Sequence, residues 1–367
     1  MGKTIVAGGK VGMTIPIGKH IYGAEWDGSS TTVWARTDNA ENFSNPNPAV
    51  GTGFGSSPFD ACYPWNEIQR VIDSNAGELV EIPIYWYKWT RNGSAMKLQI
   101  ADYPANGFLI SPAHADRGDG IGVRNHVYVG RYQCVSGYKS LSGSLPQANI
   151  TRPQARSSIH NLGSNIWQFD FAMYWTIMML YLVEYADWNS QKVVGYGCSP
   201  NTDAIFNTGA TDIMNYHTGT SATSRTAYGS VQYRWIEGLW SNAKFFCDGI
   251  WYDGGNTNKM YCFNNPSDFK DGISGGTVIG DTVPSGYPTA WTNPTVSGFE
   301  YALIPSAVGG SDSTYVCDYA SCSSNRQSVL MLGEYYGSQM AGAFMMDFNT
   351  RVDFAHIYYG CRLMKLP

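Results

Sequence analysis

Hydrophobic and polar positions follow their clearest pattern near the C-terminal end of the chain. Short apolar runs are separated there by pairs of turn-forming residues, which is typical of short β-strands joined by tight turns. The sequence therefore predicts a small set of terminal strands. The three runs span 329–332, 343–348 and 357–366, and the turn pairs are Gly337-Ser338 and Asn349-Thr350.

An aromatic row accompanies the last predicted strand. Phe354, His356 and Tyr358 are spaced two residues apart, so a strand would place all three on one face. Asp353 is the only carboxylate nearby, and bulky amphipathic side chains suit contact with a partner better than proton transfer. The same row could also be the core side of a closing hairpin, and periodicity alone leaves both interpretations open.

The preceding chain predicts further strands and three helices. A proline near the start and a glycine at the end predict a short amphipathic helix at 64–77. Thr151 as N-cap and Gly163 as a stop predict a second helix. Residues 166–191 are apolar almost all round, which predicts a helix buried on most sides. The predicted strands lie at 79–89, 96–101, 107–113 and 126–134.

Residues 1–55 differ in composition from the rest of the chain. Short β-like pieces at 4–7, 13–17 and 32–35 lie between clusters of Gly, Asn and Pro, a composition typical of loops and connectors. We expect a small N-terminal β segment or attachment arm that contributes little core, followed by a main domain at 56–367.

Composition favours surface recognition over binding of nucleic acid or insertion into a membrane. Charged residues make up 14% of the chain, against roughly 25% in average proteins. The net charge is −5 and no Lys/Arg run occurs, so the basic footprint of a nucleic-acid-binding protein is missing. The longest apolar run, 171–183, is shorter than the roughly 20 residues that span a bilayer. Abundant Tyr, Trp, Gly, Ser and Asn suit contact with protein surfaces and sugars.

Catalytic motifs are not found in the sequence. The nucleophile elbow, the P-loop, the H-E-x-x-H zinc motif and the dinucleotide glycine fingerprint are absent, and the histidines stand alone. These observations predict a protein that is not an enzyme and needs no cofactor. Asp170, Glu184 and Asp187 are interpreted as surface or capping groups. Eight cysteines show no zinc-ligand spacing, and we expect mostly buried free thiols, with a Cys317–Cys322 bridge left open.

A tight acidic loop, DRGDGIG, offers weak candidates for a metal site. Asp116 and Asp119 could contribute oxygen ligands to Ca²⁺. The spacing of an EF-hand is not met, so a glycine turn capped by its aspartates is the simpler interpretation.

Several stretches, taken together, resemble the variable proteins of diversity-generating retroelements. They are MKLQIAD, SPAHADRGDG, VYVGRYQC, FAMYWTIMMLYLVEYADWNSQ, YRWIEGLW, VCDYA, LMLGEYYGS, AGAF and GCRLMKLP. The resemblance covers residues 64–367. It implies an α+β fold: a C-type lectin-like domain, related to the formylglycine-generating enzyme, with short antiparallel strands and two or three helices.

This resemblance also implies a division of the variable region, 329–367, into fixed and diversified positions. In the family, a hypervariable surface for ligand binding is carried on a constant scaffold. The scaffold positions implied here are Gly333, Ala341, Gly342, Ala343, Phe344, Asp347, Gly360, Arg362 and Leu363. The implied ligand-binding positions are Tyr335, Tyr336, Met345, Phe348, Arg351, Asp353, Phe354, His356, Tyr358 and Tyr359.

The family includes host-tropism determinants of bacteriophage tails and some bacterial surface proteins. The resemblance thus implies a receptor-binding protein at a tail-fibre tip, or alternatively on a bacterial cell surface. The implied partners are a host cell-surface protein or glycan and other virion tail proteins, with a homotrimer as one possible assembly.

Two alternatives stay open: a lectin-like adhesin without diversification, and a copper-dependent oxidase of the formylglycine-generating type. The oxidase needs a cysteine pair after the glycine-rich strand, whereas Cys317 and Cys322 precede it.

Overall fold

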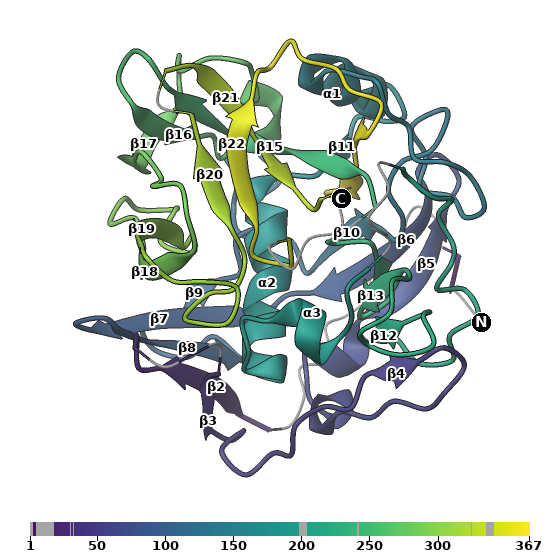
Figure 1. Ribbon diagram of the computed structural model, residues 1–367, viewed down its shortest axis with the longest axis vertical. Helices are drawn as coiled ribbons and strands as arrows, with labels where there is room; N and C mark the ends of the chain where they lie inside the picture. The colour runs from purple at the N-terminus through teal and green to yellow at the C-terminus, as the bar shows by residue number, and fades with distance from the viewer. Residues whose placement is uncertain are drawn as a thin grey trace.

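The computed structural model describes residues 3–4, 18–29, 31, 33–197, 204–240, 242–323, 325–334 and 341–367. Helix α2 (Phe171–Tyr185) lies at the centre of the molecule with strands on several sides (Figure 1). Every residue of this helix is buried, as its apolar sequence predicts. Asp170 caps its first turn by accepting a hydrogen bond from the backbone N–H of Met173 at 2.8 Å.

Two large sheets contribute many of the remaining core residues. The first is six-stranded, and its strands occur in the order β1 (Lys3–Thr4), β5 (Gln69–Asp73), β6 (Gly77–Pro83), β10 (His126–Gly130), β24 (Leu363–Lys365) and β11 (Ile166–Gln168). The second runs β17 (Thr277–Asp281), β16 (Lys259–Cys262), β15 (Lys244–Asp253), β21 (Gln327–Leu332), β22 (Met346–Thr350) and β20 (Ala320–Cys322), with β23 (Tyr359–Gly360) paired to β15.

Smaller sheets complete the described part of the chain. The five-stranded sheet has the order β3 (Ala35–Asp38), β2 (Ile21–Trp26), β8 (Ala95–Ala101), β7 (Trp86–Asn92) and β9 (Leu109–Ile110). A four-stranded sheet joins β14 (Ile236–Glu237), β13 (Val231–Tyr233), β12 (Gly219–Thr220) and β4 (Ala49–Val50), and β18 (Pro288–Thr292) pairs with β19 (Ile304–Val308). The short helices are α1 (Arg152–His160), α3 (Ser190–Val193), η1 (Pro58–Ala61), η2 (Trp65–Glu67) and η3 (Pro266–Asp268).

The expected α+β fold with a C-type lectin-like domain is wrong. The structure is mostly β, with 34% strand and 11% helix, arranged in several sheets. One cause is visible at 64–77, where a helix was expected. Only the 3-10 turn η2 forms there, and β5 follows it, because Val71 and Asp73 are buried while Arg70 and Ile72 face solvent. That alternation has the period of a strand rather than that of a helix.

The N-terminal region is more deeply built into the core than its composition indicates. Strand β2 pairs along its whole length with β8, and its side chains Tyr22, Ala24 and Trp26 are buried. Trp26 also packs edge-on against Trp188, with ring centroids 5.8 Å apart. The expectation that this region contributes little core is therefore wrong for the described residues. Most of the described Gly and Asn residues that suggested a connector lie in loops on either side of a buried strand. Residues 5–17 lie outside the described part.

Several local predictions are confirmed. Helix α1 begins after Thr151, whose hydroxyl and backbone form a capping box with Gln154. The strand expected at 96–101 appears as β8, and the one expected at 126–134 appears only over 126–130 as β10, while the strand expected at 79–89 is divided into β6 and β7. None of the described helices combines the length and apolar character needed to cross a membrane.

Candidate functional site

The segment 341–344, predicted as scaffold, is held by buried side chains. Asp318 accepts hydrogen bonds from the backbone N–H groups of Gly342 and Phe344, both at 2.8 Å. A Cβ on Gly342 would lie 2.5 Å from the Asp318 carboxylate and 2.6 Å from the Ser190 hydroxyl. Any larger residue there would displace the groups that hold the backbone, so the absence of a side chain is a packing requirement.

Helices α2 and α3 hold the same segment from the other side. Ser190 accepts from the backbone N–H of Ala343 at 2.9 Å, and the Tyr174 hydroxyl donates to the carbonyl of Ala343 at 2.9 Å. Gln191 donates to the carbonyl of Ala341 at 3.4 Å. Because five backbone N–H and C=O groups of this short segment have side-chain partners, its path is fixed by groups far away in sequence.

Arg362 anchors the chain after the last turn. Its guanidinium is fully buried and donates to the carbonyls of Gly130, Arg131, Glu237 and Gly238. Burial lowers the pKa of this guanidinium to about 10. The four carbonyls come from two separate strands and their loops, so Arg362 joins the end of the chain to both.

Asp347 and Gly360 also have structural contacts. Asp347 forms an ion pair with Lys244, with Nζ and Oδ2 2.5 Å apart, and accepts from the Ser321 hydroxyl. A Cβ on Gly360 would lie 3.1 Å from the backbone oxygen of Gln147. The scaffold positions described so far are thus all buried or closely packed, as a constant frame requires.

Two positions expected on the binding face, Met345 and Phe348, are instead buried. Met345 is 5% exposed and Phe348 is 1% exposed, and Phe348 packs edge-on against Tyr252 with ring centroids 6.3 Å apart. Their assignment to a displayed surface is wrong, since both side chains are buried in the folded chain and Phe348 belongs to the hydrophobic core. Tyr335 and Tyr336 lie outside the described residues.

The remaining predicted positions lie on one surface segment, residues 351–359, which we call the aromatic loop. Figure 1 shows it running from the end of β22 across towards α1 before the chain returns to β24. Arg351 and Asp353 are exposed and pair with each other at 2.7 Å. Phe354 is 46% exposed and its neighbour Ile357 is 57% exposed.

Aromatic rings of this loop pack together at the surface. Phe354 stacks on His356 with centroids 6.1 Å apart, and His356 contacts Tyr358 at 5.1 Å and Tyr359 at 5.0 Å. The expected strand at 354–358 is wrong, since these residues form turns and irregular backbone. The turn expected at Asn349-Thr350 is also wrong, because both residues belong to β22. The aromatic side chains therefore meet as a cluster rather than as a row along a strand.

The backbone ends of the aromatic loop are tied to the body of the protein. The backbone N–H of Asn149 donates to the carbonyl of His356 at 2.9 Å, and that of Lys244 donates to the carbonyl of Tyr358 at 3.0 Å. Lys244 also lies over the Tyr359 ring, 5.9 Å from its centroid. A short exposed loop with anchored backbone can present side chains with little further loss of entropy on binding.

The cysteines considered for oxidase chemistry are both free thiols. Cys317 is buried, and burial together with the neighbouring Asp318 raises its pKa above the ordinary value. Burial raises the pKa of Cys322 to about 11. Both thiols are therefore protonated at neutral pH in the metal-free protein.

Asp116 and Asp119 serve the turn in which they occur. Asp116 accepts from the backbone N–H of Gly118 at 2.9 Å, while Asp119 accepts from that of Ile121 at 3.2 Å and pairs with Arg124. Within the described ranges, no group of three or more His, Cys, Asp or Glu side chains is arranged to hold a metal ion.

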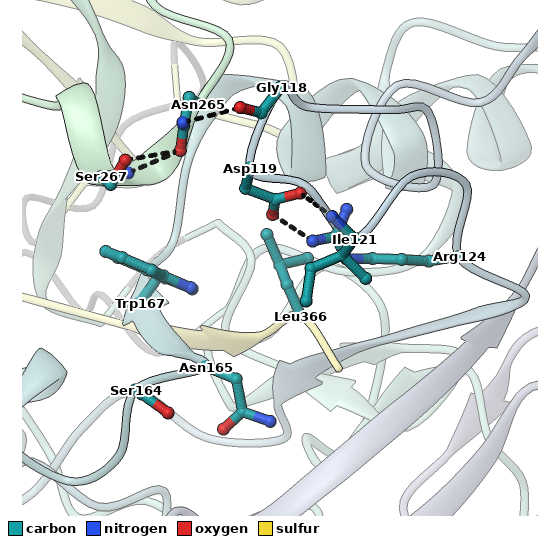
Figure 2. Close-up of a pocket in the computed structure, with 10 residues that line it drawn as sticks. All are labelled: Gly118, Asp119, Ile121, Arg124, Ser164, Asn165, Trp167, Asn265, Ser267 and Leu366. Atoms are coloured by element: carbon teal, nitrogen blue, oxygen red, sulfur yellow. Dashed lines mark hydrogen bonds and ion pairs between the residues drawn. The ribbon is translucent and has the colours of Figure 1, made fainter.

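A pocket of about 320 Å³ lies beside this turn. It brings together the acidic loop, the segment before β11 and the turn at η3, as Figure 2 shows. This pocket was not predicted from the sequence, because Trp167 was expected inside a buried helix. Its lining residues are Gly118, Asp119, Ile121, Arg124, Ser164, Asn165, Trp167, Asn265, Ser267 and Leu366.

Comparison of the chain with protein-family models finds no matching model, and comparison with curated proteins finds no significant match. The resemblance to retroelement variable proteins thus rests on the sequence motifs alone.

Proposed function

We propose that the protein is a receptor-binding protein of a bacteriophage tail and that the aromatic loop is its contact surface. The observation that carries this proposal is the contrast between the scaffold positions and the aromatic loop. The scaffold positions are held by buried hydrogen bonds and ion pairs, whereas Phe354 and Ile357 project into solvent. Exposed aromatic and aliphatic side chains on an anchored backbone are the usual anchors of a protein interface.

The exposed side chains of the aromatic loop can change without disturbing the frame, whereas Tyr359 packs against the core. Arg351 and Asp353 contact mainly each other, and Ile357 is largely exposed. We propose that a retroelement diversifies this loop and that the partner is a host cell-surface protein or glycan. Display of several copies on a virion, for instance as a trimer, would raise a modest affinity per site.

The binding surface is tested by removing the exposed apolar side chains. We expect the double variant Phe354→Ala, Ile357→Ala to bind host cells about tenfold less tightly or worse, because exposed anchors of this kind dominate interface energies. Fluorescently labelled protein, assayed on a panel of bacterial strains, measures the effect. Phe54→Ala is the matched control, since Phe54 is 90% exposed and belongs to a distant loop. Equal binding by the double variant and the control would show that the aromatic loop is not the contact surface.

Diversification is tested on the gene rather than on the protein. We expect a reverse transcriptase gene nearby, together with a near-copy of the 3′ coding segment that differs mainly at adenines. If DNA sequencing of the surroundings finds no such template repeat, the retroelement proposal fails. A lectin-like adhesin that does not vary would then remain.

A further inference from the structure

The pocket in Figure 2 has a rigid wall. Asn265 donates to the carbonyl of Gly118 at 3.2 Å and accepts from the hydroxyl and the backbone N–H of Ser267 at 2.8 and 3.0 Å. Asn264 donates to the carbonyl of Asp116 at 3.2 Å. These bonds join the acidic loop to the turn at η3, so this side of the pocket is formed before any ligand arrives.

Trp167 provides an aromatic surface on the opposite side. It is the outward-facing residue of β11, between the buried Ile166 and Gln168. The ring of His160 stacks behind the indole, with centroids 4.0 Å apart and planes inclined by 23°, and Nδ1 of His160 lies 3.0 Å from the carbonyl of Ile166. The indole is thus supported on one side, and Figure 2 shows its nitrogen turned towards the middle of the pocket.

Polar groups that make no hydrogen bond within the described part of the protein lie around this aromatic surface. Among the described residues, no hydrogen-bond partner is found for the indole N–H of Trp167, the amide of Asn165 or the hydroxyl of Ser164. An amide offers both donors and an acceptor, and a hydroxyl offers one donor and two acceptor lone pairs. Together these groups match a ligand that carries several hydroxyls.

The charges of the pocket cancel. Asp119 and Arg124 are the charged side chains in its lining, and they form an ion pair with each other. Arg124 also donates to the carbonyl of Gly122 at 3.3 Å. A paired carboxylate and guanidinium offer little net attraction to either an anion or a cation, which favours a neutral ligand.

We propose that this pocket binds a neutral hexopyranose unit of a glycan. The apolar C–H face of the sugar ring packs on the Trp167 indole and its hydroxyls bond to Asn165 and Ser164, while a hydroxyl of the neighbouring unit accepts from the indole N–H, which lies in the plane of the ring. The volume of about 320 Å³ is at the lower end for small-molecule sites and suits one sugar unit with part of its neighbour. This site is separate from the aromatic loop, and its assignment does not depend on the function proposed for that loop.

The test is an array of neutral and sialylated glycans probed with the full chain. We expect binding to neutral, hexose-terminated glycans, and a loss of about tenfold or more in Trp167→Ala, since an aromatic platform is a typical hot spot. Trp167→Phe should retain part of the affinity because the platform remains without its N–H. Asn165→Ala should weaken binding without affecting the fold, because the Asn165 amide makes no hydrogen bond within the described residues. Phe54→Ala should bind as the unmodified protein does.

The Phe354→Ala, Ile357→Ala variant separates this inference from the proposed function, because it should lose cell binding but keep glycan binding. The pocket assignment is overturned if only acidic glycans bind, if no neutral glycan binds, or if Trp167→Ala and Asn165→Ala bind like the control. Circular dichroism of each variant identifies any loss that comes from misfolding.

Discussion

Replacing Glu184 by glutamine is expected to lower the free energy of unfolding by about 3–5 kcal/mol. Glu184 forms a buried ion pair with Arg234, in which Nη2 and Oε1 are 2.5 Å apart and Nε and Oε2 are 3.1 Å apart. The Tyr233 hydroxyl also donates to Glu184 at 3.0 Å. The amide keeps the size of the side chain but leaves a buried guanidinium without its closest opposite charge.

Loss of a proton from Arg234 does not relieve the unpaired charge. Burial by itself lowers its pKa, but the attraction of Glu184 more than offsets burial and holds the pKa above the ordinary value. In the variant this attraction is lost, but an arginine side chain stays protonated at neutral pH in proteins, so the buried charge remains. Asp60 remains 2.9 Å from Nη1 of Arg234, but its side chain is 35% exposed, so solvent screens this second pair.

Chemical denaturation at neutral pH measures the effect, with Glu41→Gln as an exposed control that should leave the midpoint unchanged. A double variant, Glu184→Met with Arg234→Met, should recover part of the lost stability, because removing both charges leaves neither unpaired. Unfolding of Glu184→Gln at the same denaturant concentration as the unmodified protein would show that the ion pair contributes little.

The second large effect is a dependence of folding stability on pH that comes from the carboxyl group of Asp318. Burial raises the pKa of this carboxyl to about 7, against the lowering influence of the N–H groups of Phe344 and Gly342 and of the Cys317 thiol. Between about pH 4 and 7 the folded protein therefore holds a proton that the unfolded chain releases. Because the folded state binds more protons in this window, this contribution to stability is complete below about pH 4 and is lost as the pH rises towards 7.

Asp318→Asn removes this titration while keeping the size of the side chain. We expect the free energy of unfolding of the unmodified protein, relative to the variant, to fall with pH by up to about 1.4 kcal/mol per unit between pH 4 and 7. Urea denaturation at several pH values across this range gives the difference directly. Parallel stability curves for the two proteins would mean that Asp318 does not titrate there.

The C-terminal segment shows where the structure places the residues assigned from the family resemblance. The motif AGAF and Arg362 were assigned to a frame through the family resemblance, and the structure holds them with Asp318, Ser190 and backbone carbonyls. Phe354 is exposed, and its assignment to a binding face stays a prediction. Phe348 was misassigned because its burial depends on contacts with residues far away in the sequence, such as Tyr252.

Local sequence was sufficient wherever the controlling interactions are local. The cap at Thr151 acts on the backbone three residues later, and the apolar character of 171–185 requires burial whatever surrounds the helix. Both features follow from periodicity and capping within one or two turns of chain.

Only the tertiary structure decided the roles of Glu184 and Trp167. Glu184, expected at the surface, is buried because Arg234 reaches it from 50 positions away in the sequence. Trp167 faces a pocket because β11 replaces the first turns of the expected helix by pairing with β24. Pairing of charges and strands far apart in sequence depends on how the chain packs as a whole, whereas caps and apolar periodicity depend only on neighbouring residues.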